Sequence, residues 1–156
     1  ADSHLDLPIL IDEKSLLEND DFVPFKALNN APLAMTAHAI YEKFDKNNVA
    51  TLSKTMITEI IRSKIGFKGT LMTDDVSMKA LSGDVGTNSL LALQAGCDLV
   101  LHCNGNFDEI CQIADKISML NLISIDPTLL DVLRTKKSLN LGEITSELTH
   151  ILSKLS

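Results

Sequence analysis

Three short apolar runs, each ending on a polar or ionisable residue, constrain the fold of this chain more than any other feature. They occupy residues 32–38, 69–74 and 97–102. Near-continuous apolar runs of this length are typical of strands buried on both faces, as in a parallel sheet. Segments with helical periodicity follow each run, at residues 52–64, 87–94 and 107–120. A strand followed by a helix, repeated at roughly 30-residue spacing, predicts an α/β fold.

The ends of the helical segments carry their own signals. Ser53 is of a type that caps helix N-termini, and Gly66 and Gly96 stand where helix C-termini are expected. Residues 13–28 also have a helical pattern, with an interruption expected before Pro24. The chain therefore alternates well-delimited helices with buried strands.

The number of strands leaves two folds open. A complete barrel of eight βα units needs about 250 residues, whereas this chain has 156 and three predicted strands. It is therefore either a compact three-stranded α/β domain, whose sheet edges would be exposed, or the last part of a larger barrel. Periodicity alone does not choose between them.

Charge and hydropathy exclude several classes of protein. The net charge is −7 and there is no basic stripe, so we expect no nucleic-acid partner, because such binding needs Lys and Arg to neutralise phosphates. An acidic chain also has little to attract it to an anionic membrane, and no apolar run approaches the roughly 18 residues that span a bilayer. The first residues are polar, unlike a signal peptide, and the first is not Met. We therefore expect the chain to start inside a longer protein.

Three cysteines are present, at Cys97, Cys103 and Cys111. Their number is odd, and no pair has the CxxC spacing of a zinc site. We expect them to be buried, reduced thiols of a cytosolic protein.

The predicted strands deliver polar side chains to the end where catalytic groups collect in parallel α/β folds. Asp74 and Asp75 are the sharpest of these, because a carboxylate at the end of an apolar strand can act as a nucleophile or stabilise a cation. Adjacent residues on a strand point to opposite faces, so one of the pair is expected to face a pocket and the other to cap a following helix at residues 78–80. His38, at the end of the first strand, is either a substrate contact or a packed strand-end residue.

Asp2 and His4 form a second candidate feature at the start of the chain. A carboxylate two residues from a histidine can accept the imidazole N–H, fix the tautomer and raise the basicity of the ring. Such a histidine is a competent general acid and base near neutral pH. The alternative is an ordinary disordered terminus.

Seven segments, taken in order, resemble the family 3 β-N-acetylglucosaminidases of bacteria, glycoside hydrolases that recycle cell-wall fragments. The most specific is LMTDDVSMKALSG at residues 71–83. The others are DSHLDLP (2–8), FVPFKAL (22–28), AMTAH (34–38), ATLS (50–53), IGF (65–67) and AGCDLVLHCNG (95–105). The likeness covers residues 2 to about 105, roughly two-thirds of the chain.

The resemblance implies a TIM-type (β/α)8 barrel and a retaining mechanism. Asp74 would be the nucleophile, His4 the general acid and base on a mobile loop, and Asp2 the residue that orients His4. His38 is a candidate substrate contact. The implied substrate is N-acetylglucosamine linked to anhydro-muropeptides in the cytoplasm, and no metal or organic cofactor is implied.

The departures from the family matter as much. The family's Lys-His-x-Pro-Gly-His-Gly segment and its upstream sugar-binding residues are absent from residues 1–156. The resemblance therefore predicts a single incomplete glycosidase barrel domain over residues 1–156, in which residues 121–156 are C-terminal helices and the missing N-terminal part of the barrel is a partner. We expect little hydrolysis by this chain alone. The alternatives are a non-catalytic remnant or one half of a split protein, and a family 3 enzyme for another sugar, such as a β-glucosidase.

Overall fold

The computed structural model describes residues 6–118 and 120. The chain divides into two units, Ala1–Leu122 and Ile123–Ser156, and every described residue belongs to the first. The helices expected within residues 121–156 lie outside the described residues, so the prediction of one barrel domain over residues 1–156 stays a prediction. No helix in the described part combines the length and apolarity that a bilayer span requires.

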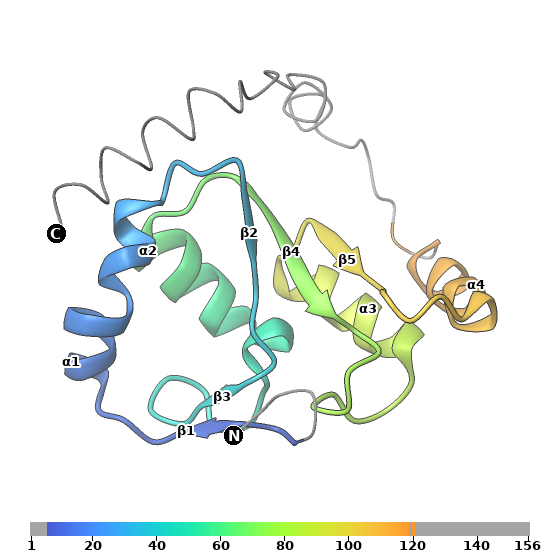
Figure 1. Ribbon diagram of the computed structural model, residues 1–156, viewed down its shortest axis with the longest axis horizontal. Coiled ribbons are helices and arrows are strands. Elements are labelled where there is room, and N and C mark those ends of the chain that lie inside the picture. The colour runs from blue at the N-terminus through green and yellow to red at the C-terminus, as the bar shows by residue number, and fades with distance from the viewer. Residues whose placement is uncertain (1–5, 119, 121–156) are drawn as a thin grey trace, which may run out of the picture. The chain divides into compact units, whose positions relative to one another are not determined.

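Three parallel strands form the centre of the first unit. They are β2 (Leu33–Met35), β4 (Thr70–Asp75) and β5 (Leu99–Leu101), in the order β2-β4-β5, and they lie side by side in Figure 1. Leu33 pairs with Thr70 on one side of β4, and Met72 pairs with Leu99 on the other. β2 and β5 fall within the predicted apolar runs, and β4 extends one residue past its run, to Asp75. The prediction of a parallel sheet is confirmed.

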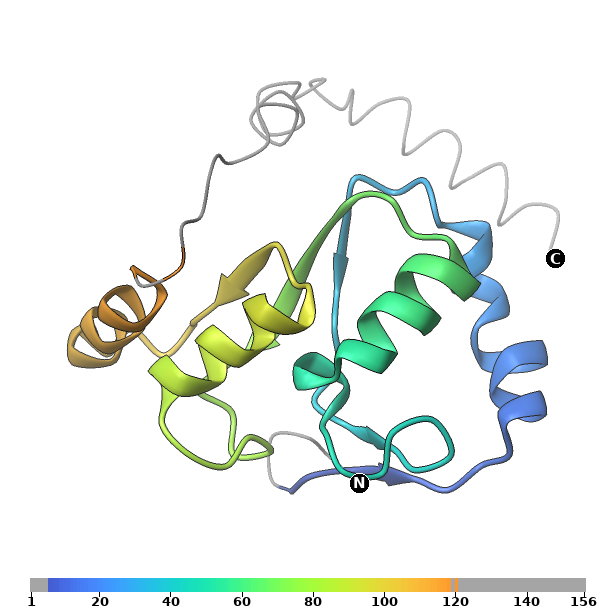
Figure 2. The same cartoon turned by 180° about the vertical axis from the view of Figure 1, so that it is seen from behind.

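Helices follow the strands and cover the sheet. After β2 come η2 (Ala50–Leu52) and the π-helical η3 (Met56–Ile65), after β4 comes α3 (Val85–Ala95), and after β5 comes α4 (Phe107–Ile117). Figures 1 and 2 show η3 and α3 on the same side of the sheet, with α4 beyond α3. The predicted helix before β2 is present in three parts, α1 (Lys14–Leu16), the π-helical η1 (Leu17–Asp21) and α2 (Val23–Ala27). The break before Pro24 is at Phe22.

The helix ends follow from local chemistry. The backbone N–H of Met56 donates to Ser53 Oγ at 3.1 Å, which is the predicted cap. Gly66 and Gly96 adopt φ of 82° and 119°, a left-handed conformation that favours glycine at a helix C-terminus. The helix expected at residues 78–80 is not formed. These residues make turns, and α3 begins later because Asp84 accepts a hydrogen bond from the Thr87 N–H at 2.8 Å.

The interior consists of three apolar clusters. One lies between the sheet and the helices η3 and α3 and contains Ile57, Leu71 and Ala92. A second joins η3 to the N-terminal helices through Leu17 and Ile60. A third places α4 beside α3. This row of helices over parallel strands is the arrangement of successive βα units.

A second, two-stranded sheet was not predicted. β1 (Ile9–Leu10) pairs in parallel with β3 (Ile40–Tyr41), and the Ile40 N–H donates to the carbonyl of Pro8 at 2.9 Å. Two-residue strands carry too little pattern to be recognised from periodicity. This pairing joins the beginning of the described chain to the segment that follows β2.

Candidate active site

Polar side chains meet at the carboxyl end of the three-stranded sheet, as predicted. His38 follows β2, Asp74 and Asp75 end β4, and His102 follows β5. Because β4 lies between the other two strands, Asp74 and Asp75 are at the centre of this edge. In parallel α/β folds this is the edge that carries chemistry.

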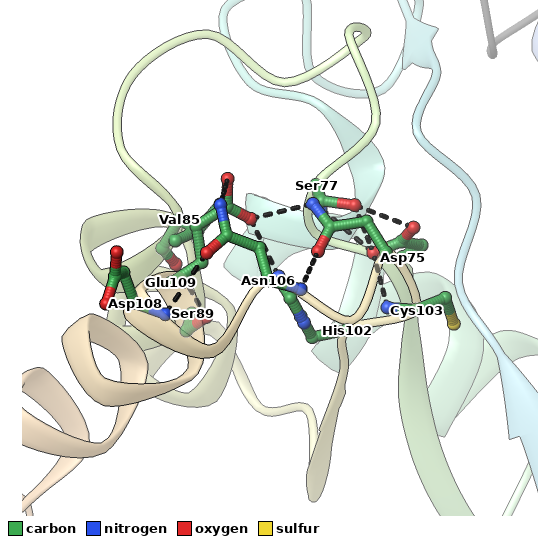
Figure 3. Close-up of polar contacts among 10 residues, drawn as sticks. Asp75, Ser77, Val85, Ser89, His102, Cys103, Asn106, Asp108 and Glu109 are labelled. Carbon is green, nitrogen blue, oxygen red and sulfur yellow. Dashed lines mark hydrogen bonds and ion pairs between the residues drawn. The ribbon is translucent and has the colours of Figure 1, made fainter.

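The carboxylate of Asp75 is occupied by hydrogen bonds. Oδ1 accepts from the Ser77 N–H at 3.0 Å and from the Cys103 N–H at 3.2 Å, and Ser77 Oγ lies 2.8 Å from both oxygens. Figure 3 shows the side chain between Ser77 and Cys103. Burial alone would raise the pKa of the Asp75 carboxyl, but the hydrogen bonds from Ser77 and Cys103 outweigh it and lower the pKa below its usual value. Asp75 therefore fastens the turn after β4 to the segment after β5.

The carboxylate of Asp74 is in a different position. It is partly buried, and within the described residues its hydrogen bond is from the Asp75 N–H to Oδ1, at 2.8 Å. Within the described residues, Asp74 thus accepts one hydrogen bond, whereas Asp75 accepts several. The expectation that one aspartate is structural is met by Asp75, although it holds a turn and not a helix. That the other faces a pocket stays a prediction. The nucleophile role of Asp74 stays a prediction.

His38 is packed into the interior, with 1% of its surface exposed. Its Nδ1 lies 2.8 Å from Thr51 Oγ1, and its Nε2 lies 2.9 Å from the carbonyl oxygen of Asp75. Both ring nitrogens therefore have partners within the protein. This is the geometry of the packed strand-end residue that the sequence left open, and a direct contact with substrate stays a prediction.

His102 forms a pair that sequence reasoning missed. Its Nε2 lies 2.7 Å from Glu109 Oε2, and Glu109 also accepts hydrogen bonds from the side chains of Asn104 and Asn106, as Figure 3 shows for His102, Asn106 and Glu109. The hydrogen bond from His102, followed by that from Asn104, lowers the pKa of the Glu109 carboxyl. Nothing in the described part of the chain hydrogen-bonds to His102 Nδ1, which is buried. The sequence feature that could have indicated this pair is Glu109, an acidic residue in the first turn of the helix that follows His102.

Asp2 and His4 lie outside the described residues, so the pairing of this predicted dyad stays a prediction. Among residues 6–118 and 120, no group of three or more His, Cys, Asp or Glu side chains is arranged to hold a metal ion.

The cysteines are not all buried as expected. Cys97 is buried, and its burial raises the pKa of the thiol to about 12. Cys103 and Cys111 are exposed, because Cys103 lies beyond the end of β5 and Cys111 points away from the apolar side of α4. The prediction of a buried thiol was therefore correct for Cys97 and wrong for the other two.

Successive βα units with two aspartates at the carboxyl end of the central strand are typical of α/β barrel-type enzyme domains. Comparison with known proteins gives the family. The model of the glycosyl hydrolase family 3 N-terminal domain matches residues 1–135. The chain therefore belongs to glycoside hydrolase family 3, and the predictions of the family and of a TIM-barrel-like α/β fold are confirmed.

Individual relatives agree with this assignment. The chain is 41% identical over 107 residues to a β-hexosaminidase of Alkalilimnicola ehrlichii, covering 66% of this chain and 30% of that protein. It is 36% identical over 153 residues to a β-hexosaminidase of Actinobacillus succinogenes, covering 93% of this chain and 44% of that protein. The structure of a family 3 β-N-acetylglucosaminidase from Paenibacillus sp. FPU-7 superposes with a TM-score of 0.68 at 29% identity, over 75% of this chain and 23% of that one. The chain thus spans less than half the length of these relatives.

Proposed function

We propose that this chain is part of a retaining exo-β-N-acetylglucosaminidase. Membership of glycoside hydrolase family 3 supports this, as do the names of its relatives. The observation that carries the proposal is the difference in hydrogen bonding between two adjacent aspartates. Asp75 is held by hydrogen bonds from Ser77 and Cys103, whereas Asp74, beside it at the carboxyl end of β4, accepts one hydrogen bond within the described residues.

In the proposed mechanism Asp74 acts as the nucleophile. One carboxylate oxygen attacks the anomeric carbon of the N-acetylglucosamine unit as the bond to the leaving oxygen breaks, which gives a covalent glycosyl-enzyme. His4 gives its proton to the leaving oxygen in this step. It then takes a proton from the water that hydrolyses the intermediate and releases the Asp74 carboxylate. Asp2 orients His4 by accepting its ring N–H. The roles of Asp2 and His4 rest on the resemblance of residues 2–8 to the family.

The proposed substrate is a peptidoglycan fragment in the cytoplasm, with a terminal β-linked N-acetylglucosamine on an anhydro-muropeptide. The protein would then serve the recycling of cell-wall material. The hexosaminidase names of the relatives support an amino sugar over glucose. This reaction needs no metal or organic cofactor, because the nucleophile and the acid/base are both side chains.

A second candidate is a half of a split protein, or a non-catalytic remnant. The observation that favours it is the short sheet of the described unit. In the described unit β2 and β5 are the edges of a three-stranded sheet, and a barrel would continue from both. We propose that the missing N-terminal part of the barrel is a partner of this chain and that the isolated chain has little or no hydrolase activity.

The test is hydrolysis of 4-nitrophenyl N-acetyl-β-glucosaminide by the isolated chain and by the protein as its gene encodes it. We expect turnover only in the second, and Asp74→Asn to reduce its kcat by orders of magnitude. Asp108→Asn, at an exposed position, is the matched control and should leave kcat unchanged. Near-normal turnover in Asp74→Asn would exclude the assignment.

Two further readouts separate the alternatives. Proton NMR of the first product should show the β-anomer, as retention requires. Faster hydrolysis of the β-glucoside than of the N-acetylglucosaminide would instead favour a β-glucosidase, and absence of turnover in the encoded protein would favour the non-catalytic remnant.

A further inference from the structure

We infer that His38 is a positioning residue for the nucleophile, acting through the backbone of Asp75 and not by contact with the sugar. The inference rests on the proposed function, because that proposal makes Asp74 the nucleophile. It starts from the place of His38 beside the end of β4 and from the hydrogen bonds at its two ring nitrogens.

The backbone pairing of β2 with β4 ends before the site. Met35 pairs with Met72, and the Thr36 N–H donates to the carbonyl of Met72 at 2.9 Å. Beyond that point the link is a side chain, since His38 Nε2 lies 2.9 Å from the carbonyl oxygen of Asp75. The end of β4 is therefore joined to the β2 side by an imidazole.

The β5 side is also irregular here. The register shifts between Met72 and Asp75, and the Leu101 N–H donates to the hydroxyl of Thr73 at 2.9 Å. Backbone pairing resumes at the end of β4, where Asp75 pairs with Leu101 and the Val76 N–H donates to the Leu101 carbonyl at 2.9 Å. The end of β4 is therefore held by backbone on the β5 side and by the His38 side chain on the β2 side.

The proton positions in this network follow from its chemistry. A carbonyl oxygen only accepts, so Nε2 of His38 carries the hydrogen. In this Nε2–H tautomer, Nδ1 accepts from the hydroxyl of Thr51, 2.8 Å away. The same hydroxyl lies 3.1 Å from the carbonyl of Ala37, but donating its single proton there would leave Nδ1 of a buried ring without a partner. Thr36 Oγ1, at 2.8 Å from Thr51 Oγ1, can donate to Thr51 in turn.

The network is shielded from water. Thr51 is 0% exposed, His38 1% and Thr36 5%. A fully paired polar network in such surroundings has one low-energy arrangement, because rotating any member leaves a buried group unpaired. His38 therefore offers its N–H to Asp75 in a fixed direction.

The link from His38 to the nucleophile is short. His38 holds the carbonyl of Asp75, while the N–H of the same residue donates to Asp74 Oδ1 at 2.8 Å. Moving the Asp75 backbone would move the carboxylate that must approach the anomeric carbon. Misplacing a reacting group by about 1 Å can cost about 100-fold in rate.

The experiment compares His38→Leu with His38→Gln in the protein as its gene encodes it. Leu removes both polar groups, whereas the Gln amide can donate from the position of Nε2. We expect kcat to fall about 10- to 100-fold in His38→Leu, with KM changed by less than about 2-fold because the side chain does not touch the sugar. His38→Gln should recover most of kcat. If His38→Leu does not fold, His38→Asn replaces it, since the shorter amide does not reach Asp75.

A second readout does not depend on activity. Nitrogen-15 NMR should show the Nε2–H tautomer of His38, and the amide signals of residues 74–77 should shift in His38→Leu. A raised KM with normal kcat would overturn the inference in favour of a sugar contact, and unchanged kcat in folded His38→Leu would overturn it outright. If the wild-type protein is inactive the proposed function fails, and the NMR then decides: unshifted signals at residues 74–77 overturn the positioning of β4, and shifted signals support it.

Discussion

The two ends of the three-stranded sheet are fastened by different chemistry. At the amino end, the carboxylate of Asp98 accepts hydrogen bonds from the Leu71 N–H at 2.8 Å and from Arg62 Nη2 at 2.7 Å, and Arg62 also donates to the carbonyl of Gly69. The side chains of Arg62 and Asp98 are 27% and 49% exposed. At the carboxyl end the fastening is the buried hydrogen-bond network of Thr36, Thr51 and His38.

The difference shows where positional precision is needed. An exposed ion pair contributes about 0–1 kcal/mol and tolerates movement, because water replaces its partners. A buried polar network has no such substitute, and leaving one member unpaired costs about 1–3 kcal/mol. The buried network lies at the end of the sheet that carries Asp74. The exposed ion pair lies at the opposite, amino end.

Thiol labelling compares the two ends of the sheet directly, because Cys97 precedes β5 and Cys103 follows it. It has the largest expected effect of the experiments proposed for this comparison. Burial raises the pKa of the Cys97 thiol to about 12, so almost no thiolate is present at pH 8. We expect a disulfide reagent to modify Cys97 at least about 100-fold more slowly than Cys103, as followed by mass spectrometry of peptides. Equal modification rates of the two cysteines in native buffer would mean that the reagent reaches the interior at the amino end of the sheet.

Thr51→Val should give the largest loss of stability. It removes the hydroxyl at the centre of the buried network and leaves His38 Nδ1 without a partner, which should cost about 2–3 kcal/mol in the free energy of unfolding. The matched control is Thr58→Val, because the Thr58 hydroxyl bonds to the carbonyl of Lys54 at an exposed position. Urea unfolding measures both, and a loss as small as that of the control would break the comparison between the two ends.

Asp75 should make the free energy of unfolding depend on pH. Its pKa is lowered in the folded state from the ordinary value of 3.8, so its stabilisation is present above that value and is lost as pH falls through the folded pKa. At pH 7, Asp75→Asn should be less stable than wild type by about 1–2 kcal/mol. Thermal melts between pH 7 and pH 2.5 should show this gap narrowing below about pH 4. A gap that stays constant would mean that the charge of Asp75 contributes nothing.

The smallest effect is expected at the amino end. Arg62→Ala should cost about 1 kcal/mol or less, because its pair with Asp98 is solvent-exposed, although some packing against the ring of Phe67 is also lost. The loss should shrink further in 0.5 M salt as the pair is screened. A cost as large as that of Thr51→Val would show that the two ends do not differ in the way described.

Much of the central fold was predictable from the sequence. The apolar runs that became β2, β4 and β5 are interrupted by few polar residues, and strands buried on both faces leave that pattern. The helix ends at Ser53, Gly66 and Gly96 also have local causes that a sequence displays. The turns at residues 78–80 were not predicted, because the same acidic residue that can cap a helix can equally hold a turn.

The site was predictable in part. The strand ends carry Asp74, Asp75 and His38, so their positions in the sequence were enough to predict that they lie at one edge of the sheet. The pair of His102 with Glu109 depends on how the loop of residues 103–106 folds back, which periodicity does not report. The partners of His38 were also hidden, because Thr51 lies 13 residues away in the chain and Asp75 lies 37 away.

The pairing of β1 with β3 determines the length of a tether. Pro8 is fixed by the hydrogen bond from the Ile40 N–H, and His4 precedes it by four residues. Four extended residues reach at most about 14 Å, which is the longest possible linker between Pro8 and the histidine that is proposed to supply the proton. Short flexible linkers give effective concentrations in the millimolar range. In the proposed mechanism a two-residue strand would therefore set the effective concentration of the proton donor, and each residue inserted after His4 would lower it.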